Sequence, residues 1–309
     1  MIDSCGGIAP LRAARWWLAV ALLCGWLFAE PERAAAQGAS EATSSREARE
    51  EVLRRLSKAE LSHEDRAKVN GILASTTIYR RLPSQVIECD PHLYVFLVEH
   101  PDLVVNIWEA LGISEVQVEQ IGEGLYSAND KAGTVGRMQF LHASPDMHVV
   151  YAEGSYEGPL FGRPIKGQSL LVLETRYFRN TSGRHYIRCR MDAFLHVENV
   201  GVGVLAKTLQ PLVGAAADHN FRETTAFLAG VSRAAEVNYA GMQRMAEKLN
   251  RVAEADREQF ASLTEQLAIR AALAATAQQE TKVAAGGKSA ASRPVPATTR
   301  RPTRSTKQR

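Results

Sequence analysis

The amino-acid sequence predicts an α+β domain in which an antiparallel sheet is covered by a long C-terminal helix. Five segments with strand character follow one another between residues 115 and 198, and turns rich in Gly, Asn, Asp and Ser separate them. These segments do not alternate with helices, which argues against a parallel sheet of βαβ units. A long amphipathic helix pattern follows the last strand.

Residues 1–36 have the pattern of an export signal. Arg12 and Arg15 precede an apolar run of 14 residues at 16–29, and the alanines at 34–36 resemble a cleavage site. The run is shorter than the roughly 20 apolar residues that span a bilayer. We therefore expect a periplasmic or extracellular protein that is not an integral membrane protein after cleavage. Retention of the signal as an anchor is the alternative.

Residues 37–80 are polar and predict an appended helical arm. Val52, Leu53 and Leu56 form a thin apolar stripe that marks one short helix. Ser62 is a predicted N-cap for a second helix, which would run through residues 63–82. The alternating charges of this arm are typical of a solvent-exposed face.

The main domain is expected to span residues 81–250. Its first candidate strand is residues 82–90, and a helical pattern follows that Pro101 interrupts and Gly112 ends. Apolar and polar residues then alternate as in strands that are buried on one face. These strands are expected at residues 115–121, 133–143, 147–158, 168–178 and 184–198.

The last of these strands has one apolar and one hydrophilic face. The apolar face carries His185, Ile187, Cys189, Met191, Ala193, Leu195 and Val197, and the other carries Tyr186, Arg188, Arg190, Asp192, Phe194, His196 and Glu198. The C-terminal segment offers a cover for the apolar face, because its apolar residues recur at steps of three and four. They are Phe221, Leu228, Val231, Ala235, Met242, Met245, Leu249 and Val252.

In this C-terminal segment, residues 200–218 predict a short helix broken at Pro211, and Asp218 is a predicted cap of the long helix. We expect a break or an exposed, coiled-coil-like stalk after about residue 252, within a helical extension over residues 251–280. Residues 281–309 hold eight of the 37 Lys and Arg residues and no acid, and they predict a disordered basic tail.

The order of these elements resembles the helix-grip fold of the START-related, birch-allergen and polyketide-cyclase-like superfamily. The resemblance covers residues 81–250 and rests on three features: the element order, the helix VNIWEALGI that leads into the second strand, and the final amphipathic helix. It implies a strongly curved sheet around the C-terminal helix, with a cavity between them.

Members of this superfamily bind lipids, sterols or polyketides, and some are cyclases or hydroxylase components. The resemblance therefore implies a concave apolar pocket for a hydrophobic small molecule. Ordinary core packing is the alternative role for each candidate wall residue. The candidates are Trp108, Phe140, Tyr151, Tyr177, Met191, Leu195 and Leu228.

The sequence contains no recognisable catalytic or metal-binding motif, and we predict no cofactor. The eight histidines lack the spacing of zinc sites, and no serine lies in a GxSxG motif. Asp192, His196 and Glu198 share a strand face, where acid–base chemistry is conceivable. Arg188 and Arg190 on the same face favour cross-strand ion pairs instead, so we assign these residues a structural role.

The cysteines and the tail leave alternatives open. After removal of the signal, Cys89 and Cys189 remain, and they either form a disulfide or pack as buried thiols. The tail could contact an anionic surface or act only as a solubilising segment, and export argues against nucleic acid. Its candidate contacts are Lys288, Arg293, Arg300, Arg301 and Arg304.

Three hypotheses for the function follow. The leading one is an exported, non-catalytic protein that binds or transfers a hydrophobic small molecule or lipid. The second is a cyclase- or hydrolase-type enzyme on the same fold, which a histidine in the cavity beside a carboxylate would support, with His148 and His185 as candidates. The third is an envelope interaction protein that uses the arm, the stalk and the basic tail.

Overall fold

A computed structural model describes residues 40–158, 164–198 and 210–290. The chain divides into two compact units, Met1–Ala268 and Ile269–Arg309. The first unit contains the sheet and the helices discussed below. In the second unit residues 269–290 are helical, so the helix includes residues 281–290 of the tail that was expected to be disordered. The predicted export signal and the tail arginines from Arg293 onward lie outside the described residues.

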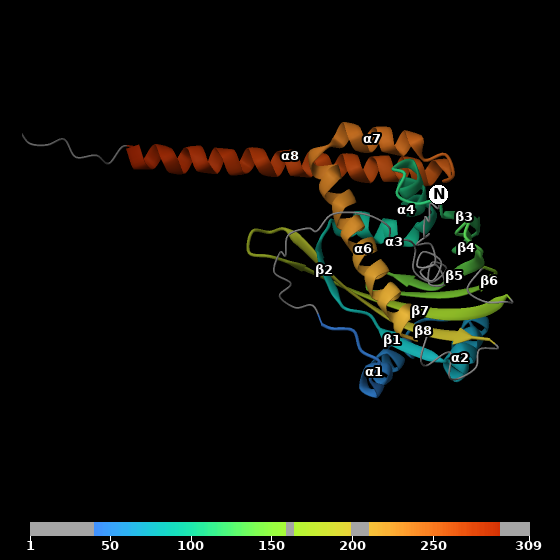
Figure 1. Ribbon diagram of the computed structural model, residues 1–309. Helices are drawn as coiled ribbons and strands as arrows, with labels where there is room; N and C mark the ends of the chain where they lie inside the picture. The colour runs from blue at the N-terminus through green and yellow to red at the C-terminus, as the bar shows by residue number, and fades with distance from the viewer. Residues whose placement is uncertain (1–39, 159–163, 199–209, 291–309) are drawn as a thin grey trace, which may run out of the picture. The chain divides into compact units, whose positions relative to one another are not determined.

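The first unit is built on one eight-stranded antiparallel sheet (Figure 1). Its order is β1-β8-β7-β6-β5-β4-β3, and β2 also pairs with β8. The strands are β1 (Ile78–Arg81), β2 (Gln85–Glu88), β3 (Gln117–Gly122), β4 (Leu125–Asn129), β5 (Thr134–Ser144), β6 (Met147–Tyr156), β7 (Ile165–Arg179) and β8 (His185–Val197). The helices are α1 (Arg46–Leu56), α2 (His63–Ser75), α3 (Pro91–Glu99), α4 (Pro101–Ala110), α6 (Gln210–Val237), α7 (Tyr239–Lys248) and α8 (Glu254–Ala290).

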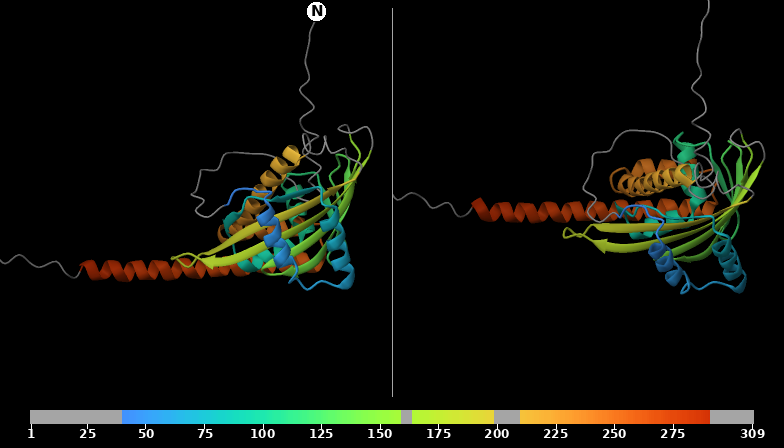
Figure 2. Two further views of the ribbon diagram at one scale, coloured as in Figure 1. Left: turned by 90° about the horizontal axis from the view of Figure 1, so that it is seen from below. Right: turned by 60° about the horizontal axis from the view of Figure 1, so that its bottom comes forward.

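The sheet is curved, and helix α6 lies on its concave face (Figure 2). The predicted fold class, a curved antiparallel sheet around long C-terminal helices, is therefore confirmed. One source of curvature is the register shift between Phe140 and His142, since a bulge bends the strand that contains it. Another is a row of cross-strand glycines, Gly136, Gly154 and Gly167, which leaves β5, β6 and β7 without side chains at one level.

The helix pair between β2 and β3 follows the predicted pattern. Asp90 caps α3 by accepting hydrogen bonds from the backbone of the first turn, and Pro101 separates α3 from α4. Gly112 follows α4 with φ of +68°, a conformation that residues with a Cβ rarely adopt. Trp108 is buried at the end of this helix.

Two short strands and one helix boundary differ from the sequence predictions. The helix expected through residue 82 ends at Ser75, and Ile78–Arg81 form β1 on the edge of β8. The expected turn region before residue 133 contains strand β4. Short segments carry little periodic signal, and their state depends on the strand that is available for pairing.

The C-terminal helices also differ in part. Helix α6 is continuous from Gln210 through Asp218, so Pro211 does not break it and Asp218 is not its cap. Instead, Asp218 forms an ion pair with Arg80 of β1. The break expected after about residue 252 is confirmed, because α7 ends at Lys248 and α8 begins at Glu254. A further break at Asn238, the N-cap of α7, was not predicted.

Both faces of the sheet are covered. The concave face forms one apolar cluster with α3, α4, α6 and α7. On the outer face, Val52 and Leu56 of α1 and Val69 and Ile72 of α2 belong to a second cluster that includes Phe194 of β8. The N-terminal helices were expected to be solvent-exposed, but their apolar stripes pack on the sheet. This burial explains why Phe194 lies on the otherwise hydrophilic face of the last strand.

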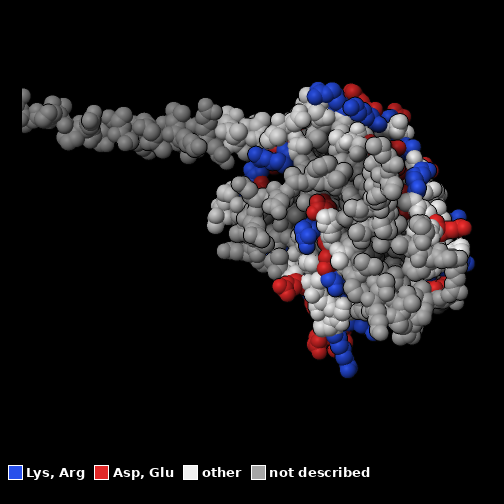
Figure 3. All heavy atoms as spheres, in the orientation of Figure 1, with Lys and Arg blue, Asp and Glu red and all other residues white. Residues whose placement is uncertain are grey.

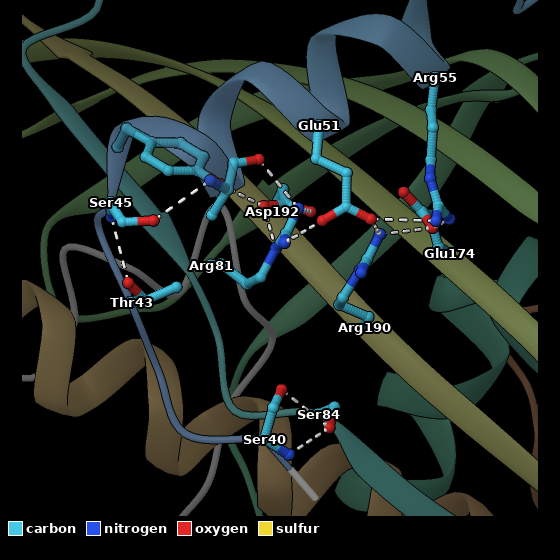
Figure 4. A network of polar contacts seen from close by, with 12 residues as sticks. Ser40, Thr43, Ser45, Glu51, Arg55, Arg81, Ser84, Glu174, Arg190 and Asp192 are labelled. Carbon is cyan, nitrogen blue, oxygen red and sulfur yellow. Dashed lines mark hydrogen bonds and ion pairs between the residues drawn. The ribbon is translucent and has the colours of Figure 1, made fainter.

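A network of charged side chains joins α1 to the same outer face (Figure 4). Asp192 is 0% exposed and accepts hydrogen bonds from Arg81 at 2.9 and 3.2 Å. Arg81 also donates to Glu51 of α1 at 2.7 Å. Arg190 joins Glu51 to Glu174, with distances of 3.1 and 2.8 Å. Because these charges are partly desolvated and multiply bonded, the network holds α1 against β1, β7 and β8.

The network acts on the pKa of Glu51. Partial burial on its own would raise this pKa, but the hydrogen bond from Arg81 and the charges of Arg190 and Arg81 outweigh that effect and lower it to about 2 from an ordinary 4.5. Since the folded-state pKa is depressed, the resulting stabilisation is complete above about pH 4.5 and is lost as the pH falls towards 2.

We expect Leu56→Ala to lower the free energy of unfolding by about 2–5 kcal/mol, because it removes a buried side chain between α1 and the sheet. Leu56 is 3% exposed, whereas Leu111, the matched control, is 51% exposed. Leu111→Ala should change stability by less than about 0.5 kcal/mol. Urea denaturation measures both. Equal, small effects would mean that α1 is not part of the cooperative fold.

We expect Glu51→Gln to lower the free energy of unfolding by about 1 kcal/mol at pH 7, because it removes the charge between Arg81 and Arg190. When denaturation is measured from pH 7 down to pH 2, the difference in the free energy of unfolding between Glu51→Gln and the wild type should become smaller below about pH 4.5. Glu60→Gln, at an exposed glutamate, is the control. A difference that stays constant over this pH range would contradict the role of the Glu51 carboxylate.

Candidate functional site

A cavity of about 150 Å³ lies between the concave face of the sheet, α3 and α6. The sheet contributes a continuous apolar wall, because alternate residues of neighbouring strands point to the same face. This wall includes Met138, Phe140, Val150, Ala152, Leu171 and Leu173. Helix α6 contributes Phe221, Thr225 and Leu228, which are spaced to share one helix face.

Three of the candidate wall residues line this cavity, namely Phe140 of β5, Met191 of β8 and Leu228 of α6. They come from three elements that are far apart in the sequence, and the curvature of the sheet brings them together. Leu97 and Val98 of α3 also line the cavity, and neither is among the residues predicted from the sequence. The apolar pattern of residues 93–98 is the sequence feature that could have indicated that this helix lines the cavity.

The other four candidates lie elsewhere. Trp108 packs edge-on against Phe227, with ring centroids 5.5 Å apart, and Leu195 pairs with Ile78 of β1. Tyr177 donates a hydrogen bond from its hydroxyl to the carbonyl of Pro145. Tyr151 packs with the outer cluster, because its neighbours Val150 and Ala152 occupy the concave face. Strict strand alternation excludes Tyr151 from the wall once Val150 is placed there.

Most polar groups on the wall already have partners within the protein. The Tyr94 hydroxyl lies 3.2 Å from both Thr175 Oγ1 and Cys189 Sγ. The Thr225 hydroxyl donates to the carbonyl of Phe221 at 2.9 Å, as is common for a threonine within a helix. These groups can tolerate an apolar neighbour without losing a hydrogen bond.

His148 is the one imidazole on the wall, and it is 1% exposed. Its Nε2 lies 3.2 Å from Glu99 Oε1 at the end of α3, and its Nδ1 is buried with no protein partner within hydrogen-bond distance. Burial lowers the pKa of His148, although the hydrogen bond and charge of Glu99 act in the opposite direction. A neutral imidazole is therefore favoured at pH 7.

The two cysteines are buried free thiols in the structure and do not form a disulfide with each other. Cys89 lies near the carbonyl of Leu228, and Cys189 lies beside the Tyr94 hydroxyl. Burial raises the pKa of each thiol to about 12. Because the thiolate is the reactive form, neither cysteine is suited to nucleophilic chemistry.

The carboxylates of the outer face have structural roles. Asp192 pairs with Arg81 and Glu174 with Arg190, and in each pair the two residues are direct neighbours across adjacent strands. The predicted cross-strand ion pairs are therefore present. Within residues 40–158, 164–198 and 210–290, no three His, Cys, Asp or Glu side chains are grouped to hold a metal ion.

Charges of both signs lie close together on the one face drawn in Figure 3. In the face shown in Figure 3, Lys and Arg side chains lie beside Asp and Glu side chains over most of the described part. Among the helices of residues 40–158, 164–198 and 210–290, none has the length and apolar character needed to cross a bilayer.

No protein-family model and no curated protein matches the sequence. Among solved structures, the chain is similar to a conserved protein from Geobacillus kaustophilus, with 12% identity over 48% of this chain and 96% of the other and a TM-score of 0.34. It is also similar to Ara h 8.0201, with 8% identity over 50% of this chain and 98% of the other and a TM-score of 0.31. A third similar structure is the lipid transfer and protein localization domain of human StarD13, with 12% identity over 48% of this chain and 76% of the other and a TM-score of 0.26. With TM-scores below 0.5, the fold assignment rests on the sheet order and the position of α6.

We expect iodoacetamide at pH 8 to alkylate Cys89 and Cys189 at least about tenfold more slowly in the folded protein than in guanidinium chloride, because burial suppresses the thiolate. Mass spectrometry of the peptides measures each site separately. Rapid labelling of either cysteine in the folded protein, or a bridge between the two under non-reducing conditions, would contradict the buried-thiol assignment.

Proposed function

We propose that this protein binds a small hydrophobic molecule in the cavity between the sheet and α6. The observation that supports the proposal is the composition and volume of the cavity. Its wall is mostly aliphatic and aromatic, and its polar groups other than His148 are paired internally or part of a helix. An apolar cavity of about 150 Å³ accepts ligands of the size of benzene.

The volume limits the ligand class. Pockets for drug-sized ligands measure roughly 300–1,000 Å³, so the present cavity has room for one ring or a short aliphatic chain. A lipid would place only one ring or the end of an acyl chain here, unless α6 moved away from the sheet. We therefore propose that the cavity binds an apolar group of about the size of one ring, either as a free molecule or as part of a larger one.

Export to the periplasm or the exterior remains part of the proposal, supported by the sequence pattern of residues 1–36. A contact of the basic tail with an anionic surface also remains a prediction from the sequence. Removing residues 291–309 and measuring co-sedimentation with anionic vesicles would test it.

An enzyme on the same fold is a second candidate, because one specific observation favours it. His148 lies on the cavity wall beside the carboxylate of Glu99, as a general base and its orienting group would. His185, the other candidate histidine, pairs with Arg179 at the end of the β7–β8 hairpin and does not line the cavity. Binding remains the leading proposal, because the described wall provides no nucleophile with a lowered pKa.

We expect the purified chain to bind toluene with a dissociation constant below about 1 mM, which corresponds to about −4 kcal/mol. Ala152→Leu adds three carbons to the wall, and it should weaken this binding at least about tenfold by filling the cavity. Ala132→Leu, at an exposed alanine in the loop after β4, should bind toluene like the wild type. Isothermal titration calorimetry measures all three proteins.

A variant that enlarges the cavity provides the complementary test. Leu228→Ala should cost about 2–5 kcal/mol of stability and should bind naphthalene more tightly than the wild type does. Absence of toluene binding to the wild type, or equal toluene affinities for the wild type and Ala152→Leu, would remove the basis of the proposal.

A further inference from the structure

The polar groups of the cavity wall differ in whether they can accept a new hydrogen bond. The Tyr94 hydroxyl is engaged with Thr175 and Cys189, and the Thr225 hydroxyl is engaged with the carbonyl of Phe221. His148 differs from both, because its Nδ1 is buried and no protein donor or acceptor reaches it. Buried polar atoms in folded proteins nearly always have a partner, so this nitrogen indicates where a ligand group would bind.

The contact with Glu99 decides which kind of group this nitrogen would bind. An ionised carboxylate only accepts hydrogen bonds, so the Nε2 of His148, 3.2 Å from Glu99 Oε1, must be the protonated nitrogen. In a neutral imidazole the other nitrogen, Nδ1, then carries a lone pair and accepts. A ligand atom at this position must therefore donate a hydrogen bond, which a hydroxyl does and an ether or ketone oxygen does not.

We propose that the ligand is a small apolar ring or chain that carries one hydroxyl group, and that His148 Nδ1 accepts the hydrogen bond from this hydroxyl. The inference rests on the proposed function, since it assigns a ligand class to the same cavity. The remaining wall has a physical consequence for selectivity. A hydroxyl placed against Phe140, Leu173 or Leu228 would lose its hydrogen bond to water and gain none.

His148 would thus determine the orientation of the ligand as well as its class. The ring of His148 lies edge-on to Phe140, with centroids 6.2 Å apart, and Glu99 holds its other nitrogen. These two contacts limit rotation of the imidazole. A ligand hydroxyl would therefore bind at the β6 side of the cavity, and the apolar body would lie towards α6.

The test compares phenol, toluene and anisole as probes on the wild type and on His148→Phe. Phenol donates a hydrogen bond, anisole only accepts, and toluene does neither. We expect the ratio of phenol to toluene affinity to fall at least about tenfold in His148→Phe, the usual scale for one lost hydrogen bond. Toluene should bind both proteins similarly. Because the hydration of each probe is the same in all experiments, the change in this ratio reports the protein group alone.

His92→Phe is the matched control, because it makes the same replacement at an exposed histidine of α3 that does not line the cavity. It should leave the phenol-to-toluene ratio unchanged. An unchanged phenol-to-toluene affinity ratio in His148→Phe would overturn the inference. Wild-type affinities for anisole and phenol that exceed the affinity for toluene by the same factor would overturn it as well. Failure of toluene to bind the wild type would instead contradict the proposed function itself, so the two failures are distinguishable.

Nitrogen-15 NMR of the histidines in the wild type gives a second measurement that needs no variant of His148. We expect Nε2 to be protonated and Nδ1 to be unprotonated at pH 7, with the Nδ1 resonance shifting on addition of phenol and not of toluene. A protonated Nδ1, or an Nδ1 resonance that does not respond while phenol is bound, would overturn the assignment.

Discussion

The fully buried carboxylate of Asp192, in the middle of β8, is the constraint on which the arrangement of the first unit depends. A buried charge without a partner would cost several kcal/mol, so Asp192 requires the guanidinium of Arg81 beside it. Arg81 is in place only when β1 pairs with β8 in the observed register. Through Glu51, the same guanidinium fixes helix α1 on the outer face. One ion pair thus couples the N-terminal helices to the centre of the sheet.

Coverage of the outer face leaves the concave face to the C-terminal helices. Strands β7 and β8 are buried on both sides, by α1 and α2 outside and by α6 and its neighbours inside. The bulge in β5 and the row of glycines across β5–β7 allow the sheet to curve. A straight helix cannot follow a curved sheet along its whole length. The cavity lies between the two, and the small side chain of Ala152 is part of its wall.

The chemistry of the cavity follows from which polar groups the fold has already satisfied. The hydroxyl groups of Tyr94 and Thr225 form their hydrogen bonds within the protein, so a ligand would meet them as apolar surface. His148 keeps one nitrogen without a protein partner, while the contact with Glu99 defines which of its two nitrogens carries the proton. Under the proposed function, a ligand without a hydrogen-bond donor would leave this described acceptor unpaired, which carries a free-energy cost.

The sequence by itself determined the local elements that have strong periodicity or clear punctuation. Alternation located β5–β8, Pro101 separated α3 from α4, Gly112 ended α4, and the C-terminal break was expected close to where α8 begins. Strand β4 was not predicted, because its short segment has a turn-like composition. The cross-strand ion pairs of Asp192 and Arg190 also followed from their positions on one strand face.

Only the tertiary structure decided how the two faces of the sheet are covered. Helix α1 has too few apolar residues for its sequence to reveal a buried face, and its packing depends on Phe194, more than a hundred residues later. Only three of the seven candidate residues line the cavity, for a similar reason. Phe140, Met191 and Leu228 meet because of sheet curvature, whereas Trp108 and Tyr151 are placed elsewhere by helix packing and strand alternation. The partner of His148 likewise depends on α3 lying over β6, a long-range contact that local residue patterns do not encode.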